Sequence, residues 1–333
     1  MRTSQRGGAL LAVLWLSVAL SAIAFSVATN VRGETERAST ATDGLRAYYL
    51  ASGSLDRAML WIYWGLWGGY ANEDGTPKFY RAPMPYIRYN YESGEVLVEV
   101  IPEGGKLNAN RATPEELMRL LIALGLPDDR ARQIALGIVD YRTAAEASAG
   151  PPSITPTGPG GSTFRPRHAS LEELEEILLV PGMTPDIFYG RFDRDPGGRL
   201  IPRGGLRDCL TVFGFGQVDI NTAPETLLES FGVPPAVAGQ IVARRIVAPF
   251  KSMDEVQPVL TAAGVEPGKF GIGGSSLWTL RATARLRLAN GKYSDVRRTV
   301  AATVRYLQNN QANPPYHVLR WYDDAWTPFV PPM

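Results

Sequence analysis

Residues 9–28 read ALLAVLWLSVALSAIAFSVA, twenty positions with no charge and three serines. At a rise of about 1.5 Å per residue, a helix of this length spans roughly the 30 Å hydrocarbon core of a bilayer. A short leader, residues 1–7, precedes the run and carries Arg2 and Arg6. The sequence therefore predicts an apolar helix over residues 8–33 that is long enough to cross a membrane once.

Three interpretations of this segment are open. A cleaved secretory signal would use the A-x-A site at residues 22–24, although the apolar run continues past it. A plain membrane anchor is the second, with an orientation set only weakly because Arg32 and Arg37 match the two arginines of the leader. The third resembles pilin-like leaders, which are cut after a glycine directly before the apolar helix. Here the cut would follow Gly7 and leave Gly8 as the first mature residue.

The fifth mature position separates this chain from most pilin-like proteins, which usually carry a glutamate there. Counted from Gly8, this position is Ala12. A carboxylate in lipid is costly unless it is paired, and in pilin filaments its partner is the terminal amine of a neighbouring subunit. A subunit with alanine at this position could not make that contact.

Composition argues for a structural protein and against an enzyme or a polycationic nucleic-acid binder. The 333 residues include 34 basic and 33 acidic ones, for a formal charge of +1. Cys209 is the single cysteine, and the two histidines, His168 and His317, lie far apart in the sequence. No metalloprotease, nucleotide-binding or serine-hydrolase motif is present, so we expect no enzymatic activity.

Beyond the apolar run, the helix is predicted to continue and to pack against a sheet. A stripe at helical spacing supports this and consists of Leu45, Tyr48, Ser52, Leu55, Met59, Ile62 and Leu66. Glycines at 65, 68 and 69 are expected to end the helix.

Strand patterns occur in two places that are almost two hundred residues apart. Residues 86–103 alternate and are split at Ser93-Gly94, which predicts a hairpin. A second hairpin is predicted around Asn290-Gly291, with residues 278–288 as its first strand. The polar side of that strand carries Arg281, Arg285 and Arg287, which we interpret as a solvated outer face rather than a nucleic-acid stripe.

An internal repeat lies between these two regions. Each copy begins with an asparagine and a proline at the start of a helix, and it continues to a glycine-x-proline break. From the glycine onward both copies share the pattern G-[LV]-P-x-x-x-A-x-Q-I. The matched positions are Asn110, Pro114, Gly125 and Pro127 in the first copy and Asn221, Pro224, Gly232 and Pro234 in the second. Thr113 with Glu116, and Thr222 with Glu225, each fit a capping box. We expect two helical hairpins, with residues 144–166 as a flexible loop rich in Gly, Pro, Ser and Thr.

The repeat resembles helix-hairpin-helix modules, many of which grip DNA backbones. DNA binding would require cations at the hairpins. The first hairpin instead carries Asp128 and Asp129, and residues 231–235 of the second carry no charge. We therefore favour packing or protein contact over DNA binding.

The order of several motifs resembles the minor pseudopilin K family of type II secretion systems (general secretion pathway protein K). These motifs are the Arg-Gly leader before an apolar helix, Lys106-Leu107-Asn108-Ala109-Asn110, Val218-Asp219-Ile220-Asn221-Thr222-Ala223-Pro224 and Pro249-Phe250-Lys251-Ser252. The resemblance implies an α+β fold, with a long pilin-like N-terminal helix on a small antiparallel sheet and a large all-helical insertion that contains the duplicated units. The implied segments are residues 34–105 and 275–333 for the body and residues 106–274 for the insertion.

The resemblance also implies a function. Family members are substrates of prepilin peptidase, which is associated with N-terminal methylation, and cross the inner membrane once with the C-terminal domain in the periplasm. They sit at the pseudopilus tip, above its shaft, and bind the minor pseudopilins I and J. The family lacks the glutamate that Ala12 replaces. No nucleic-acid partner is implied; a membrane-anchored DNA-uptake protein is the alternative.

Some members of the family bind calcium. Asp193 and Asp195, followed by Gly197 and Gly198, form the first candidate loop, and residues 72–75 form the second. Calcium takes six to eight oxygen ligands, which neither loop supplies by itself, so an exposed turn is the preferred interpretation of both.

Overall fold

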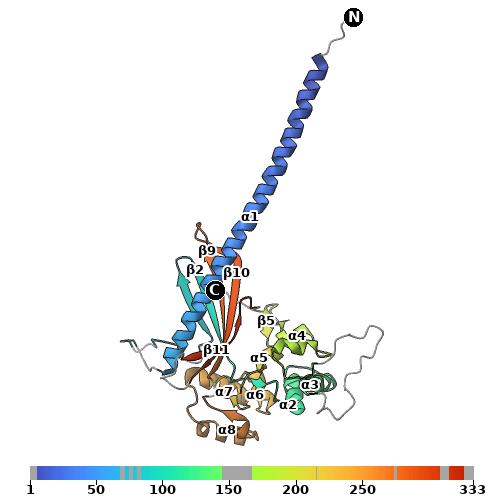
Figure 1. The fold of residues 1–333 in the computed structure, drawn as a ribbon. Helices are drawn as coiled ribbons and strands as arrows, with labels where there is room; N and C mark the ends of the chain where they lie inside the picture. The colour runs from blue at the N-terminus through green and yellow to red at the C-terminus, as the bar shows by residue number, and fades with distance from the viewer. Residues whose placement is uncertain are drawn as a thin grey trace.

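Helix α1 runs unbroken from Arg6 to Trp67 and projects far out of the head of the molecule (Figure 1). Its C-terminal part lies on a sheet, while its N-terminal part stands free of the head. This confirms the predicted continuous helix. The computed structural model describes residues 6–67, 72–74, 78–80, 84–144, 167–214, 216–273, 276–307 and 315–325. The predicted loop at 144–166 lies outside these residues, except for residue 144.

A five-stranded antiparallel sheet forms the body of the head, in the order β1-β2-β9-β10-β11. Its strands are β1 (Tyr86–Tyr91), β2 (Gly94–Pro102), β9 (Leu277–Arg287), β10 (Tyr293–Tyr306) and β11 (Tyr316–Tyr322). Both predicted hairpins are present. Strands β2 and β9 pair directly, with Val98 opposite Ala282, although the whole insertion separates them in the sequence.

The core between α1 and the sheet depends on small residues that the predicted stripe did not include. Leu55, Met59 and Ile62 are buried as predicted, whereas Leu45 and Leu66 are 56% and 44% exposed. The buried face also contains Ala47, Ala51 and Ala58. Alanines allow the helix backbone to approach the sheet closely. The buried face of α1 is therefore rotated about the helix axis, away from the predicted stripe of larger side chains. Spacing alone favoured the larger residues and misplaced both ends of the stripe.

This helix–sheet core supports a matched pair of substitutions. Ile62→Ala removes a fully buried side chain and should lower the free energy of unfolding by about 2–5 kcal/mol. Leu66→Ala, one turn further along the helix and 44% exposed, should lower it by less than about 1 kcal/mol. Urea unfolding of the detergent-solubilised chain measures both. Equal losses would contradict the placement of this face.

The opposite face of the sheet is not the solvated face that the sequence suggested. Arg281 is only 8% exposed, and its guanidinium lies 3.0 Å from Oε2 of Glu99 on the neighbouring strand. Arg285 donates from Nε to Glu95 at 2.7 Å. Part of this face is covered by the insertion, since Thr279, Arg281 and Thr303 line a cavity of about 500 Å³ together with Glu173 and Arg207. The prediction was wrong for Arg281 because the alternating pattern does not show what packs on the second face.

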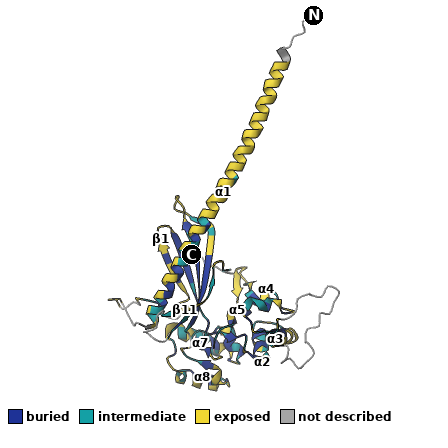
Figure 2. Ribbon diagram, viewed as in Figure 1, coloured by how far each residue is buried: buried dark blue, intermediate teal, exposed yellow. Residues whose placement is uncertain are grey.

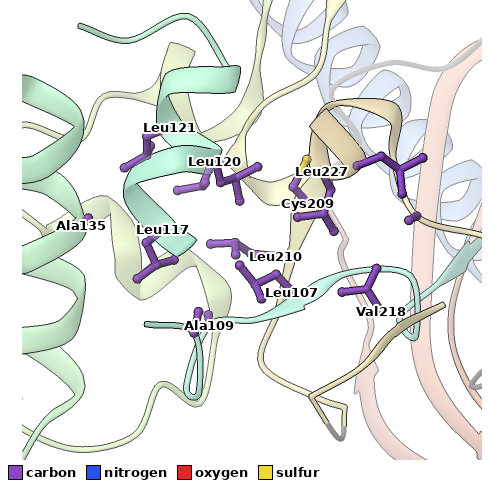
Figure 3. Packing of buried hydrophobic residues seen from close by; sticks show 14 of the residues in the cluster. Leu107, Ala109, Leu117, Leu120, Leu121, Ala135, Cys209, Leu210, Val218 and Leu227 are labelled. Atoms are coloured by element: carbon purple, nitrogen blue, oxygen red, sulfur yellow. The ribbon is translucent and has the colours of Figure 1, made fainter. Parts of the chain in front are cut away.

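The insertion between β2 and β9 has a hydrophobic core of its own, separate from the core beneath α1. Figure 3 shows part of this core, where Leu117 and Leu120 of α2 lie close to Leu227 of α6 and to Leu210. Its longer helices are α2 (Pro114–Ala123), α3 (Asp128–Arg142), α6 (Glu225–Ser230), α7 (Pro235–Val247) and α8 (Gln257–Ala262). Cys209 is buried in this core, as expected of a small apolar group.

Residues 106–274, expected to be all helical, also contain short strands. These are β3 (Leu107–Asn108), β4 (Arg191–Arg194), β5 (Leu200–Arg203), β6 (Leu210–Thr211), β7 (Val218–Asp219) and β8 (Phe270–Gly271), and they form three two-stranded sheets. The remaining elements are the short helices α4 (Pro185–Tyr189) and α5 (Leu206–Cys209) and the 3-10 turns η1 (Leu174–Leu179), η2 (Met253–Glu255) and η3 (Pro267–Lys269). Most of these strands have two residues, too short to show a period in the sequence.

Candidate functional site: the projecting helix and the two helical hairpins

The projecting part of α1 exposes an unusual amount of apolar surface (Figure 2). Leu10 and Phe25 are each 72% exposed and Trp15 is 67% exposed. Among the described residues, this is the one helix whose length and apolar composition would suit a membrane crossing. Large exposed apolar surfaces mark contacts with other proteins or with lipid. The helix is therefore compatible with a single-pass membrane anchor.

Two hydroxyl groups of the projecting part of α1 form hydrogen bonds within the helix. The hydroxyl of Ser17 donates to the carbonyl of Val13 at 2.9 Å, and that of Thr29 donates to the carbonyl of Ser26 at the same distance. Such internal bonding suits a segment without water around it. Both Gly8 and Ala12 lie on exposed positions of α1, and the first carboxylate of the chain is Glu34.

The two repeat asparagines make the same pair of contacts in the two copies. Asn110 accepts from the backbone N–H of Leu171 at 2.8 Å and donates from Nδ2 to its carbonyl at 2.9 Å. Asn221 bonds both backbone groups of Phe250 at the same two distances. Each amide therefore fastens the start of a repeat to a buried residue far ahead in the chain. The sequence pattern located both asparagines but gave no sign of their partners.

The hairpin turns are also equivalent. Gly125 and Gly232 both have φ of +91°, a conformation that favours glycine. The following amides close the helix ends in the same way, from Leu126 to the carbonyl of Leu121 and from Val233 to that of Leu228. Pro127 and Pro234 then occupy the N-cap positions of α3 and α7. The repeated glycine and proline are explained by the geometry of the turn alone.

The first helix of the second copy is shorter by one turn. Helix α2 has ten residues and α6 has six, so equivalent residues are 221 − 110 = 111 positions apart before the helix and 232 − 125 = 107 apart after it. The N-caps are Thr113 and Pro224, which makes Pro224 the counterpart of Thr113 rather than of Pro114.

Only one of the two predicted capping boxes forms. Thr113 accepts from the amide of Glu116 at 3.2 Å, and Glu116 accepts in return from the amide of Thr113 at 2.9 Å. The second box was wrong, because the Thr222 hydroxyl donates instead to Oδ2 of Asp219 at 2.7 Å. Glu116 also bonds Nζ of Lys269 at 2.7 Å, which joins α2 to the segment after the second hairpin.

Asp219 and its counterpart Asn108 support a prediction on pH. Both side chains accept from the amide two residues ahead, Asn108 from Asn110 at 2.8 Å and Asp219 from Asn221 at 3.2 Å. Burial raises the pKa of Asp219 above its ordinary value of 3.8, although hydrogen bonds from Thr222 and Asn221 oppose this shift. Between the ordinary and the raised pKa the folded state binds more protons than the unfolded state, so stability falls as pH rises through that window.

Asp219→Asn should remove this dependence. We expect the variant to gain stability relative to the natural chain as pH rises from about 4 to about 7, as measured by urea unfolding at the two values. Asn108→Asp makes the opposite change in the first copy and should lose stability with rising pH. A constant difference across this range for Asp219→Asn would contradict the argument.

The charges of the hairpins do not favour a grip on DNA. Arg130, beside the first turn, donates to the carbonyl of Gly182 at 3.1 Å. Arg244 pairs with Glu255 at 2.6 Å, and Arg245 donates to the carbonyl of Ile220 at 2.8 Å. These cations bond within the head, whereas phosphate binding requires cations that neutralise the ligand.

The two candidate calcium ligands lie on a small hairpin formed by β4 and β5. Asp193 pairs with Arg191 at 3.0 Å and with Arg203 at 3.2 Å, while Asp195 accepts from the amide of Arg199 at 2.8 Å. A carboxylate between two arginines does not fit a calcium ion, which requires several free oxygens. Residues 72–74 of the second candidate are described and Gly75 lies outside the described residues. Within the described residues, no group of three acidic, histidine or cysteine side chains could hold a metal ion. Calcium binding stays a prediction from the resemblance.

No sequence pattern indicated the polar contacts between the insertion and the sheet. Glu173 pairs with Arg320 of β11 and accepts from the hydroxyl of Tyr322 at 2.9 Å. A second contact joins the insertion to the segment that follows β2, where the amide of Asp219 donates to the carbonyl of Gly104 at 2.9 Å. These partners lie more than a hundred residues apart, and no local pattern connects them.

Comparison with known proteins supports the architecture. No family model and no curated protein sequence matches the chain. Among solved structures, a chain of the crystal structure of the GspK-GspI-GspJ complex from the enterotoxigenic Escherichia coli type 2 secretion system matches with a TM-score of 0.61 and 15% sequence identity. The match covers 87% of this chain and 100% of that chain. The chain therefore has a minor pseudopilin K-like fold, with a long N-terminal helix on an antiparallel sheet.

Proposed function

We propose that this chain is the minor pseudopilin K of a type II secretion system and acts as a structural subunit rather than an enzyme. The single observation that carries the proposal is the match in fold, which extends over the whole of a chain from a GspK-GspI-GspJ complex. The exposed apolar part of α1 adds independent support, because a subunit that starts from the inner membrane needs an anchor of this kind.

In this proposal prepilin peptidase cuts after Gly7, and the mature chain begins at Gly8 with a modified, methylated amine. Helix α1 then crosses the inner membrane once and leaves the head in the periplasm. The absence of a carboxylate at Ala12 removes the group that would contact a subunit placed above. The chain would therefore occupy the first position, at the tip of the pseudopilus, with the shaft below it.

The position of the insertion supports the same assignment. It lies at the end of the head that is remote from the N-terminus of α1, so it would cap a filament whose helices run toward the membrane (Figure 1). A filament that grows from the inner membrane beneath this cap would push folded proteins toward the outer membrane. The partners of the chain would be the minor pseudopilins I and J of its own system.

Co-purification tests this proposal. The full chain, expressed with pseudopilins I and J of its own system and extracted in detergent, should elute with both as one complex. Expression of I and J without the chain gives the reference elution. If I and J elute together while this chain elutes alone, the tip assignment is wrong. The alternative, a DNA-uptake protein, predicts tight filter retention of DNA that falls steeply between low and moderate salt.

A further inference from the structure

One edge of the sheet lies beside a groove that no described segment of the chain fills. Strand β1 is the edge strand, and α1 lies mainly over β9 and β10, toward the other side of the sheet. The resulting groove has a volume of about 370 Å³. It is lined by Arg57 and Trp61 of α1 and by Ile87, Arg88 and Tyr89 of β1.

The backbone of β1 is arranged to accept another strand. Tyr91 pairs with Gly94 across a two-residue turn, and the carbonyl of Pro85 accepts from the amide of Val100 at 2.8 Å. Because antiparallel strands alternate their bonding direction, the odd-numbered residues of β1 bond toward β2. The even-numbered ones, Tyr86, Arg88 and Asn90, direct their N–H and C=O groups away from the sheet. An edge with free groups of this kind is a template for a further strand.

The charge at this edge is positive. Arg57 and Arg88 are both exposed, and neither forms an ion pair with a described residue. The guanidinium of Arg57 lies over the ring of Tyr89, 4.7 Å from its centroid. The nearest acids of β2 are already engaged, Glu99 by Arg281 and Glu95 by Arg285. The acidic residue nearest to β1 in the sequence is Glu92, which lies in the turn after the strand.

The side chain of Tyr89 adds a polar group without a partner. Tyr89 is 9% exposed, and its hydroxyl is buried with no hydrogen bond to any described residue. Burial raises its pKa to about 12. A buried hydroxyl normally has a partner, so this one indicates that the environment of the groove is incomplete in the isolated chain.

We propose that β1 receives a sixth strand from a partner protein, an extended segment in which acidic and apolar side chains alternate. The apolar residues would lie beside Ile87 and Tyr89, and the acidic ones beside Arg88 on the other face. The chain does not supply such a strand itself, since none of its segments outside the described residues alternates acidic and apolar side chains. This edge and its occupant go beyond the assignment as a pseudopilin and can be tested without it.

The test uses the full chain in detergent and two end-blocked peptides, Thr-Glu-Val-Glu-Val-Glu-Thr and its counterpart with lysine in place of each glutamate. We expect the glutamate peptide to bind at least about tenfold more tightly at low salt, as measured by fluorescence anisotropy. At saturation, hydrogen exchange should slow at the amides of Tyr86, Arg88 and Asn90. The amides of β11, the opposite edge strand, should keep their exchange rates.

Two variants separate the charge from the backbone contribution. Arg88→Glu should reverse the preference between the two peptides. Asn90→Pro removes an amide that points away from β2, so it should abolish binding while the amides of β9 stay protected, which shows that the head remains folded. Equal binding of the two peptides, or binding that leaves exchange in β1 unchanged, would overturn the proposal.

Discussion

Replacing Asn221 by alanine should lower the free energy of unfolding of the head by about 2–4 kcal/mol, since it leaves a buried N–H and a buried C=O without partners. Phe250, which carries both groups, is 4% exposed, so water cannot replace the amide side chain easily. Asn110→Ala should have a similar effect, because Leu171 is 3% exposed and is held in the same way. Urea unfolding followed by far-ultraviolet circular dichroism, which reports on the helices of the insertion, measures the loss.

The control for this prediction is an asparagine whose contact is local and exposed. Asn290 accepts from the amide of Lys292 at 3.0 Å in the turn between β9 and β10. Asn290→Ala should lower the free energy of unfolding by less than about 1 kcal/mol. If all three alanine variants lost the same small amount of unfolding free energy, the paired hydrogen bonds of Asn110 and Asn221 would not stabilise the head.

The second large effect concerns the apolar part of α1. Val18→Lys combined with Ala22→Lys places two charges on one face, near the middle of the run. Each lysine near the centre of a membrane helix costs about 2.5–3.5 kcal/mol, so the pair should cost about 5–7 kcal/mol. We expect the doubly substituted full chain to leave the membrane fraction in a vesicle flotation experiment.

Position along the helix provides the matched control. Ser39 and Thr42 are exposed residues of α1 beyond the apolar run. Two lysines at these positions change the charge by the same amount and should leave flotation unchanged. A chain that floats equally well with either pair of lysines would not depend on residues 9–28 for its membrane association.

Much of the body could be predicted from the sequence because its signals are local and periodic. Residues 9–28 indicate a long apolar helix, and the alternation around Asn290-Gly291 gives a hairpin that the structure confirms. The repeated glycine-x-proline also identified both helical hairpins, because few residue types other than glycine adopt the positive φ that the turn needs. In these places one short stretch of sequence contains the whole cause of the structure.

The remaining features depend on contacts between distant residues. Nothing near Asn221 in the sequence shows that it fastens Phe250, and nothing near Arg281 shows that the insertion covers its face of the sheet. The second capping box is an exception with a local cause: Asp219, three residues before Thr222, accepts the hydroxyl that the pattern assigned to the helix. The free edge at β1 likewise follows from strand order, which is fixed only when β2 pairs with β9.

Mass spectrometry of the mature chain, isolated from membranes of its own host, tests most directly whether the apolar helix remains joined to the head. We expect residues 1–7 to be absent and the chain to begin at Gly8, with all of residues 9–28 retained. A chain that begins at Phe25 would have lost most of the apolar run, and it could not be an anchored subunit of a pseudopilus.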